Sequence, residues 1–391
     1  MSNAHSRIRS RLQMWTLLLG STMTVMAGAV IAPALPQLLE VFHDAPHAEL
    51  VVKLLLAIHA LFIALSAPFI GGFMDRWGRK PVLVASIILY GVAGSSGFYL
   101  NSLLGISLGR AFLGVSVAGI MSGFTTLIGD YYKGEKLHKI MGLQAAFAGF
   151  GGLVFLTVSG ALAGFGWRLP FLVYLFAFCV LPGALFFLSD TPAQQGMNHE
   201  VNENITFESV RSPLLGICCI AFIGMMMFYL VPVQLPYLLH DMPGVSSMQV
   251  GLAIGIMNLV GALSSTQFKK VKERFSHQQI VALFALFMGG GYGLLGLAQS
   301  YGVVVIGLVI SGIGFGLLMP NVNVWVVSLV PQSLRGQSVG WLTTFFLLGQ
   351  CVSPLLAEPF VKGVGIQAVY GGACGILLCM ALFFVWFARR N

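Results

Sequence analysis

Residues 71–83 read GGFMDRWGRKPVL and place Asp75, Arg76, Arg79 and Lys80 between two long apolar runs. Only 9% of the residues of the whole chain are charged. Charge is costly inside hydrocarbon, so it concentrates where a membrane chain leaves the bilayer. The stretch therefore indicates a short loop between two membrane-spanning helices.

The composition supports a membrane protein. Hydrophobic residues make up 57% of the 391 residues, aromatic residues 12%, and the mean hydropathy is +0.88. A soluble domain of this length could not bury so much apolar surface. The pI of about 9.3 could indicate a nucleic-acid partner, but cytoplasmic loops of membrane proteins also collect Lys and Arg. We therefore expect a lipid bilayer as partner and no nucleic acid.

A helix needs about 20 apolar residues to cross a bilayer, and runs of this kind recur along the chain. They predict an all-α integral membrane protein with twelve spans. The expected spans are 14–36, 49–71, 82–100, 103–128, 140–163, 168–188, 213–239, 247–268, 278–298, 302–329, 337–360 and 366–388.

The orientation is predicted from the cations. With the N-terminus inside, most of the 21 lysines and arginines fall in inner segments, and Arg110 lies within a span. Cytoplasmic loops carry such an excess, so both termini are expected in the cytoplasm. The run 14–36 is expected to be a span and not a cleaved signal, because it is long and has no convincing small-residue cleavage site.

The chain is expected to consist of two related halves. The longest polar stretch, residues 189–211, follows the sixth span and is interpreted as a cytoplasmic loop between domains 1–188 and 212–391. Residues 109–119 (GRAFLGVSVAG) are similar to residues 306–316 (IGLVISGIGFG). Repeats of this kind let one half of a transporter rock against the other around a central site.

The stretch 71–83 resembles the loop between the second and third helices of the major facilitator superfamily, which has Gly, then Asp-Arg, then Gly-Arg-Lys. The resemblance covers the whole chain, including Arg110-x3-Gly114 and RGQSVG at 335–340. It implies two pseudo-symmetric six-helix bundles. Within that superfamily the chain resembles the bacterial twelve-helix drug:proton antiporters, as in APALPQL at 32–38 and LGQCVSPLLAEP at 348–359.

Glycines in this loop permit a tight turn and close helix approach, and Asp75 can meet the positive end of another helix. The resemblance implies that this end belongs to the span 337–360 and that Arg79 bridges to Asp130, which holds the cytoplasmic side shut. The alternative is a simple positive-inside anchor. The matching loop at 264–277 keeps cations but lacks the glycines and the Asp, which predicts a latch in the first half only. The expected gating residues are Gly72, Asp75, Arg76, Gly78, Arg79, Lys80 and Asp130.

Arg110 is a cation inside a span and must face protein or water. It shares a helical face with Gly114 and Ala118, small residues that let a neighbouring helix bring carbonyls to the guanidinium. Arg110 either braces the fold in this way, or it tunes a proton site or meets substrate.

Drug:proton antiporters often carry an acid in the first or fourth span, but residues 16–36 contain none and the fourth span has none before Asp130. The remaining candidates for a proton carrier are His59 and Glu358, because a histidine or a desolvated carboxylate can titrate near neutral pH. Each could instead be structural. If protons drive transport, a neighbouring Arg110 would disfavour a charged imidazole and favour a deprotonated carboxylate.

The substrate is inferred from polar groups near the midplane. These are few and stand beside methionines and aromatic rings, which suits amphiphilic or lipophilic cargo better than a sugar. A packing role for the methionines is the alternative. The expected substrate contacts are Arg110, Met226, Tyr229, Asn258, Asn323 and Gln350.

Two functions compete. The first is proton-driven export of small amphiphilic or hydrophobic compounds, and the second is uptake or facilitated transport of one small metabolite. No cluster of His, Cys, Asp or Glu has catalytic or metal-ligand spacing, so we expect no enzyme, no metal and no cofactor. A monomer in the plasma membrane, as in a bacterial inner membrane, is expected.

Overall fold

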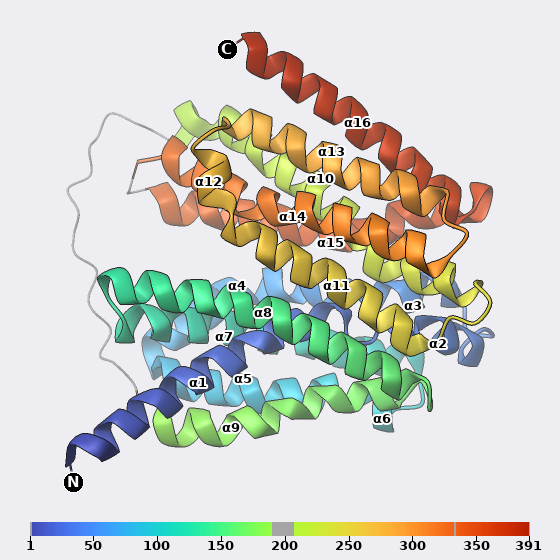
Figure 1. The fold of residues 1–391 in the computed structure, drawn as a ribbon. Coiled ribbons are helices and arrows are strands. Elements are labelled where there is room, and N and C mark those ends of the chain that lie inside the picture. Colours follow the sequence, from blue (N-terminus) through green and yellow to red (C-terminus); the bar gives the residue numbers. More distant parts are fainter. Residues whose placement is uncertain (1, 190–206, 332–333, 391) are drawn as a thin grey trace. The chain divides into compact units, whose positions relative to one another are not determined.

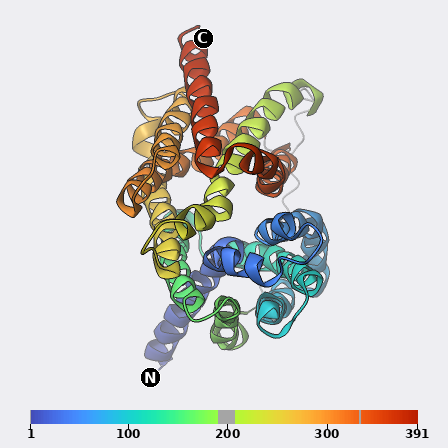
Figure 2. The ribbon, with the colours of Figure 1, turned by 90° about the vertical axis from the view of Figure 1, so that its right-hand side faces the viewer.

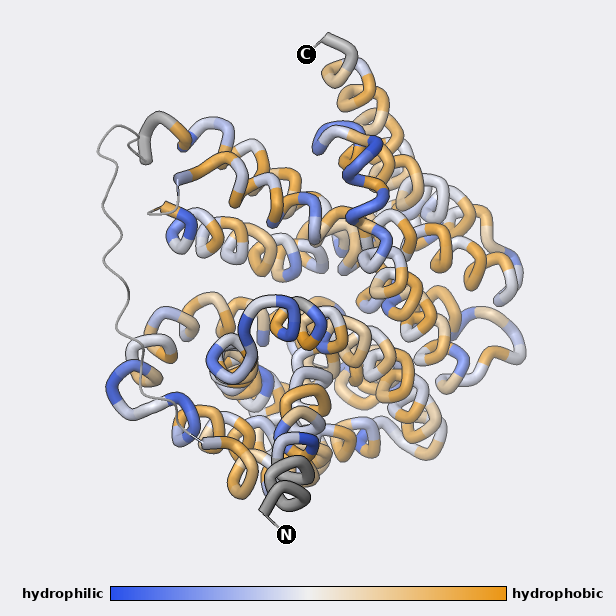
Figure 3. Tube along the Cα trace, turned by 60° about the vertical axis from the view of Figure 1, so that its left-hand side comes forward, coloured by the Kyte–Doolittle hydropathy of each residue, from blue (hydrophilic) through white to orange (hydrophobic). Residues whose placement is uncertain are grey.

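The computed structural model describes residues 2–189, 207–331 and 334–390, and all regular structure in them is helical (Figure 1). Twelve segments of these residues are long and apolar enough to cross a membrane, which confirms the predicted number of spans. Hydrophobic residues dominate the helices along their length (Figure 3). The protein is therefore an all-α membrane protein.

The chain forms two compact units. The N-terminal unit contains residues 1–194 and 246–255, and the C-terminal unit contains residues 195–245 and 256–391. The predicted loop 189–211 lies mostly outside the described residues, and its last residues belong to α10 (Phe207–His240). The domain bounds 1–188 and 212–391 remain a prediction.

Six spans come from the first part of the chain, and helices of the N-terminal unit are seen nearly end-on, side by side, in Figure 2. The elements of this part are α1 (Ser2–Ala29), η1 (Ala32–Ala34), α2 (Leu35–Val41), α3 (Ala48–Leu54), α4 (Ile58–Trp77), α5 (Arg79–Gly94), α6 (Ser96–Tyr99), α7 (Leu103–Tyr131), α8 (Gly134–Ala163), η2 (Leu169–Leu175) and α9 (Phe176–Phe187).

The second part of the chain supplies the other six spans. Its elements are α10, α11 (Ser247–Thr266), α12 (Phe268–Lys272), α13 (His277–Gly296), α14 (Tyr301–Leu329), α15 (Arg335–Val364) and α16 (Ile366–Arg390). The first residues of α11, up to Gly255, group with the N-terminal unit.

Two of the expected spans are interrupted. The run expected at 14–36 stops being α-helical after Ala29 and resumes at Leu35, because Pro33 and Pro36 lack the N–H that a continuous helix needs. The run expected at 49–71 breaks between α3 and α4, at residues 55–57. Carbonyl groups at such helix ends have no helical donor and are available to other partners.

The two units repeat one packing scheme. In the N-terminal unit α1 packs on α8, and α5 packs on both α7 and α9. In the C-terminal unit α10 packs on α15, and α13 packs on both α14 and α16. In each set of six spans, the first span packs on the fifth, and the third span packs on the fourth and on the sixth. The predicted pseudo-symmetric bundles are confirmed.

Each unit also contains a buried tyrosine pair that repeats. Tyr90 and Tyr174 have ring centroids 5.6 Å apart, and Tyr292 and Tyr370 have centroids 5.2 Å apart. In each pair the tyrosine of the third span, Tyr90 or Tyr292, donates its hydroxyl to a backbone carbonyl of the first span of the same unit. The acceptors are the carbonyl oxygens of Met23 and Met227.

Candidate functional site

The loop between α4 and α5 turns at a single residue. Gly78 ends α4 and precedes α5 with φ 90° and ψ 158°, a conformation that side chains with a Cβ rarely adopt. Gly71 and Gly72 lie inside α4, and a Cβ on either would meet nothing within 4 Å. The tight turn is confirmed at Gly78, whereas Gly71 and Gly72 take no part in it, and the close helix approach expected of them remains a prediction.

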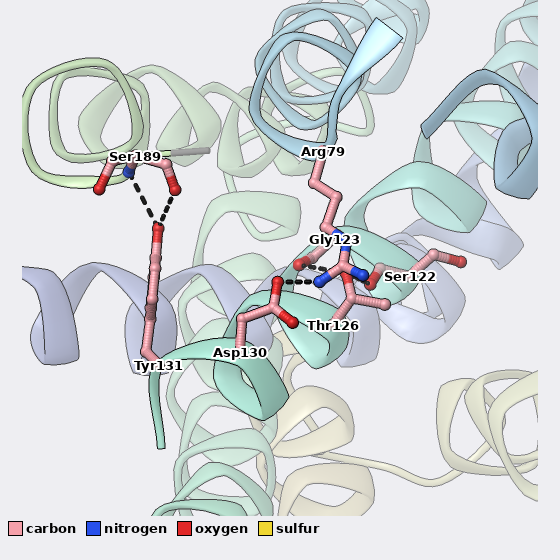
Figure 4. A network of polar contacts seen from close by, with 7 residues as sticks. All are labelled: Arg79, Ser122, Gly123, Thr126, Asp130, Tyr131 and Ser189. Carbon is pink, nitrogen blue, oxygen red and sulfur yellow. Dashed lines mark hydrogen bonds and ion pairs between the residues drawn. The ribbon is translucent and has the colours of Figure 1, made fainter. Parts of the chain in front are cut away.

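Arg79 begins α5, and Asp130 lies in the last turn of α7. Nη1 of Arg79 donates to the carboxylate of Asp130 (Figure 4). Each side chain is 21% exposed. The ion pair implied by the family resemblance is therefore present, and it joins two helices of the same unit.

Two further contacts tie the same end of the N-terminal unit together. Nζ of Lys80 donates to the carbonyl of Leu185 in α9 at 2.8 Å. The hydroxyl of Tyr131 donates to the carbonyl of Ser189 at 2.5 Å and accepts from its N–H at 2.9 Å (Figure 4). The ends of α5, α7 and α9 are thus fastened to one another around the charged loop.

Asp75 and Arg76 are exposed in the last turn of α4. The contact expected between Asp75 and the span 337–360 would join the two units, and it remains a prediction.

Arg110 is completely buried in α7. Its Nε donates to the carbonyl of Leu55 at 2.8 Å, and its Nη2 donates to the carbonyl of Ala27 at 2.7 Å. Its Nη1 donates to the hydroxyl of Tyr174 at 2.7 Å. Leu55 follows the end of α3 and Ala27 lies in the last turn of α1, so the guanidinium satisfies carbonyl groups that the two helix breaks release.

Gly114 lets α4 approach α7 closely beside this arginine. A Cβ on Gly114 would lie 2.3 Å from the carbonyl oxygen of His59. The C-terminal unit repeats this contact between α14 and α11, where a Cβ on Gly312 would lie 2.7 Å from the carbonyl oxygen of Met257. The small-residue face expected next to Arg110 is confirmed.

His59 is buried with its Nδ1 atom 3.4 Å from Nη2 of Arg110. A guanidinium can only donate, so this hydrogen bond requires an Nδ1 without a proton. The ring proton then belongs on Nε2, an assignment made from the hydrogen bond. The contact places the positive charge of the Arg110 guanidinium against the imidazole of His59.

The other expected substrate contacts lie in the second part of the chain. Gln350 of α15 and Tyr229 of α10 are buried, and the two helices pack closely, with a bond of 2.7 Å from the hydroxyl of Ser353 to the carbonyl of Met226. Asn258 is half-buried in α11. Asn323 is exposed and donates to the carbonyl of Met319 in its own helix at 2.8 Å. The substrate role of these residues remains a prediction.

The sequence-family model described as the Major Facilitator Superfamily matches residues 17–266 and 217–391. The chain belongs to the Major Facilitator Superfamily. It is 27% identical to the class E tetracycline resistance protein of Escherichia coli over 85% of this chain and 83% of that protein. It is 24% identical to the multidrug resistance protein MdtG of Yersinia enterocolitica over 100% of this chain and 96% of that protein.

Among solved structures, the chain is similar to a D-xylose-proton symporter, with a TM-score of 0.75 at 15% identity over 95% of this chain and 96% of that one. At this identity the likeness shows the fold alone. The chain is thus a member of a transporter superfamily, a class that is not enzymatic, and it resembles the drug-efflux branch as the sequence indicated.

Gln234 of this transporter was not among the expected site residues. Its side chain is 1% exposed, and neither Oε1 nor Nε2 has a hydrogen-bond partner among the described residues. An amide buried in this way costs about 1–3 kcal/mol for each unsatisfied group. The available signal was its place between Pro232 and Pro236 in α10, because two prolines inside a span interrupt helical hydrogen bonding.

Glu358 is the buried acid of α15, with a side chain 5% exposed. Its Oε1 atom lies 3.7 Å from Nζ of Lys362, one turn further along the same helix. The lysine side chain is 57% exposed, so the ion pair extends from the interior towards the surface.

Proposed function

We propose that this transporter exports small amphiphilic or hydrophobic compounds by proton-coupled alternating access. The observation that carries the proposal is the unsatisfied Gln234 amide in a helix rich in methionine and aromatic residues. In that helix Met227 is buried, and the ring of Phe228 stacks on Phe315 with centroids 3.9 Å apart. Such a surface offers cargo a large apolar contact and one hydrogen-bonding amide.

The relatives support export over uptake. Two drug-resistance proteins match most or all of this chain, as reported above. The charged loop supports alternating access, because Arg79, Lys80 and Tyr131 make the loop end of the N-terminal unit rigid enough to move as one body. Asp75 would then close this side against the second half by meeting the end of the span 337–360.

The proton is proposed to bind at Glu358. The guanidinium of Arg110 disfavours a second positive charge on His59, whereas Glu358 is a buried carboxylate whose lysine partner, Lys362, is largely exposed. Protonation of Glu358 in one facing state and its ionisation in the other would couple the proton gradient to transport.

Transport by the purified protein in proteoliposomes tests the function. Lipophilic cationic dyes and a set of sugars are offered with and without an imposed pH gradient. We expect the pH gradient to drive transport of the dyes and no transport of the sugars. Gradient-driven movement of a sugar without dye transport would establish an uptake carrier for a metabolite instead.

The coupling site is tested in the same vesicles with Glu358→Gln and His59→Ala. Glu358→Gln should abolish gradient-driven accumulation and retain downhill exchange, while His59→Ala should keep both. If accumulation survives in Glu358→Gln and in the variant that combines Glu358→Gln with His59→Ala, the proton binds at Asp130 or another group, or a different ion drives transport.

We propose a monomer in a bacterial inner membrane with both termini in the cytoplasm. Lys and Arg are in excess in the loops that lie on the same side of the membrane as the N-terminus, and this excess supports the orientation.

A further inference from the structure

Two apolar cavities lie on either side of the first half of α13, within the C-terminal unit. One has a volume of about 590 Å³ and lies between α13 and α16, where Leu286 and Leu382 line it. The other has a volume of about 570 Å³ and lies between α11, α13 and α14, where Leu263 lines it. Phe275 and Leu283 line both cavities, so the two meet at the start of α13.

The segment at this meeting point is strongly basic. Helix α12 and the turn after it contain Lys269, Lys270, Lys272 and Arg274, with Glu273 as the one acid among them. Lys269, Lys270 and Arg274 are exposed, and Lys272 is half-buried. α12 packs on both α13 and α14.

The basic segment and the cavities form one continuous surface. Val271, between two of the lysines, lines the second cavity, and Phe275, next to Arg274, lines both. The positive charges therefore stand at the entrance to two apolar spaces. This segment is the counterpart of the charged loop 71–83, but it lacks the glycines and the Asp of that loop, so its cations are not explained by the latch.

We propose that this surface binds one diacyl anionic phospholipid. The cations hold the phosphate group, and one acyl chain lies in each cavity, so that the lipid straddles α13. The match of charge with the two cavities selects this occupant: a neutral lipid would leave the cations without a partner, and a soluble phosphate would leave the cavities empty. Each basic residue near a membrane surface raises the affinity for an anionic lipid headgroup by about fivefold.

Native mass spectrometry of the full-length transporter tests this site, with dioleoyl phosphatidylglycerol and dioleoyl phosphatidylethanolamine offered in equal amounts. We expect one retained phosphatidylglycerol. Replacing Lys269, Lys270, Lys272 and Arg274 together by Gln should weaken its retention by at least a hundredfold, at about fivefold for each cation. Lys133, Lys136 and Lys139, exposed cations of the N-terminal unit, replaced together by Gln are the matched control and should retain the lipid.

The acyl chains are tested by filling each cavity separately. Leu382→Trp and Leu263→Trp change side chains that are 72% and 58% exposed, so the fold should tolerate the larger ring. Each should weaken retention by displacing one chain, whereas Leu104→Trp on α7, at 72% exposure and outside both cavities, should not.

Four results would overturn the proposal. Equal retention of phosphatidylethanolamine would show that the site does not select charge. Equal loss in the Lys133, Lys136 and Lys139 control would show a general surface effect. Loss in the charge variant with unchanged retention in both tryptophan variants, or full displacement by free glycerol phosphate, would show that the cations bind headgroups or phosphate without the cavities.

Discussion

At the scale of single residues, Arg110 shows how a membrane protein accommodates a buried charge. Its hydrogen bonds go to backbone carbonyls of two interrupted helices and to a tyrosine hydroxyl. The breaks at residues 30–34 and 55–57 supply acceptors that continuous helices would have consumed. These contacts are the ones that a bracing role requires, and the 3.4 Å contact with Nδ1 of His59 also places Arg110 beside a candidate proton carrier, so the tuning and substrate roles remain predictions.

Arg110→Leu should lower the thermal stability of the N-terminal unit. The change removes the donor to the carbonyl of Leu55 and to the hydroxyl oxygen of Tyr174 in a buried place, and it leaves the carbonyl of Ala27 with the 3.4 Å hydrogen bond from the Tyr174 hydroxyl. We expect a loss of about 1–3 kcal/mol for each unsatisfied group, measured as a fall in Tm in detergent. Arg168→Lys, at a partly exposed arginine, is the control and should cost about 1 kcal/mol or less. An unchanged Tm in Arg110→Leu would contradict the bracing role.

Gln234→Leu should separate stability from transport. Removing a buried amide that has no hydrogen-bond partner among the described residues should leave the free energy of unfolding unchanged or raise it by about 1 kcal/mol, seen as an equal or higher Tm. Transport should fall because cargo loses its hydrogen-bonding contact. Gln37 is the matched control, since its Nε2 donates to the carbonyl of Ala163 at 2.9 Å and Gln37→Leu should lower Tm. Full transport activity in Gln234→Leu would remove this residue from the proposed site.

At the scale of helices, close packing depends on glycines placed where a neighbouring backbone arrives. Gly114 on α7 and Gly312 on α14 occupy the same place in their units, each against a carbonyl oxygen of the second span of its set. Helix interfaces in membranes rely on such small residues, because lipid supplies no hydrophobic drive for association. The repeat in sequence therefore reflects a repeat in packing.

Gly114→Ala should force α4 away from α7. The new Cβ would lie 2.3 Å from the His59 carbonyl oxygen, and backbone cannot yield as a side chain can. We expect a loss of about 1–3 kcal/mol, seen as a lower Tm. Gly129→Ala on the same helix has nothing within 4 Å and should be neutral or stabilising by up to about 1 kcal/mol. Equal changes in Tm at the two positions would show that helix propensity, and not the contact with the His59 carbonyl oxygen, determines the change in stability.

At the scale of the whole molecule, transport requires the two halves to change their arrangement. The contacts of Arg79, Lys80 and Tyr131 all lie within the N-terminal unit and stiffen one end of it. Asp75 lies beside them, exposed at the end of α4. Arg76 is exposed there too, and Asp75 is the one of the two whose negative charge a helix N-terminus would attract.

Asp75→Asn should reduce transport without unfolding the protein. The change keeps the shape of the side chain and removes the charge that would meet a helix N-terminus. A loss of about 1–2 kcal/mol shifts the closed-to-open ratio by about fivefold to thirtyfold. Transport rate and Tm are measured together, with the exposed Asp44→Asn as control. Normal transport in Asp75→Asn would reduce the loop to a positive-inside anchor.

The residues of the loop 71–83 show how far sequence reasoning reached. The turn at Gly78 was predictable because its conformation is a local property, and the Arg79–Asp130 pair was implied by family resemblance. The close helix approach expected at Gly71 and Gly72 remains a prediction, because a glycine in a sequence does not show what stands opposite it.

The sequence by itself determined the class of protein, the twelve spans and the repeat, since hydrophobicity over about 20 residues and helix-scale similarity are properties of contiguous chain. Only the tertiary structure decided that Arg110 binds the carbonyls of Ala27 and Leu55, that His59 lies against the Arg110 guanidinium, and that the buried Gln234 amide has no hydrogen-bond partner among the described residues. These facts depend on where separate helices break and meet. The partners of Arg110 lie tens of residues away along the chain, so the linear sequence shows neither which buried polar atoms meet a partner nor which do not.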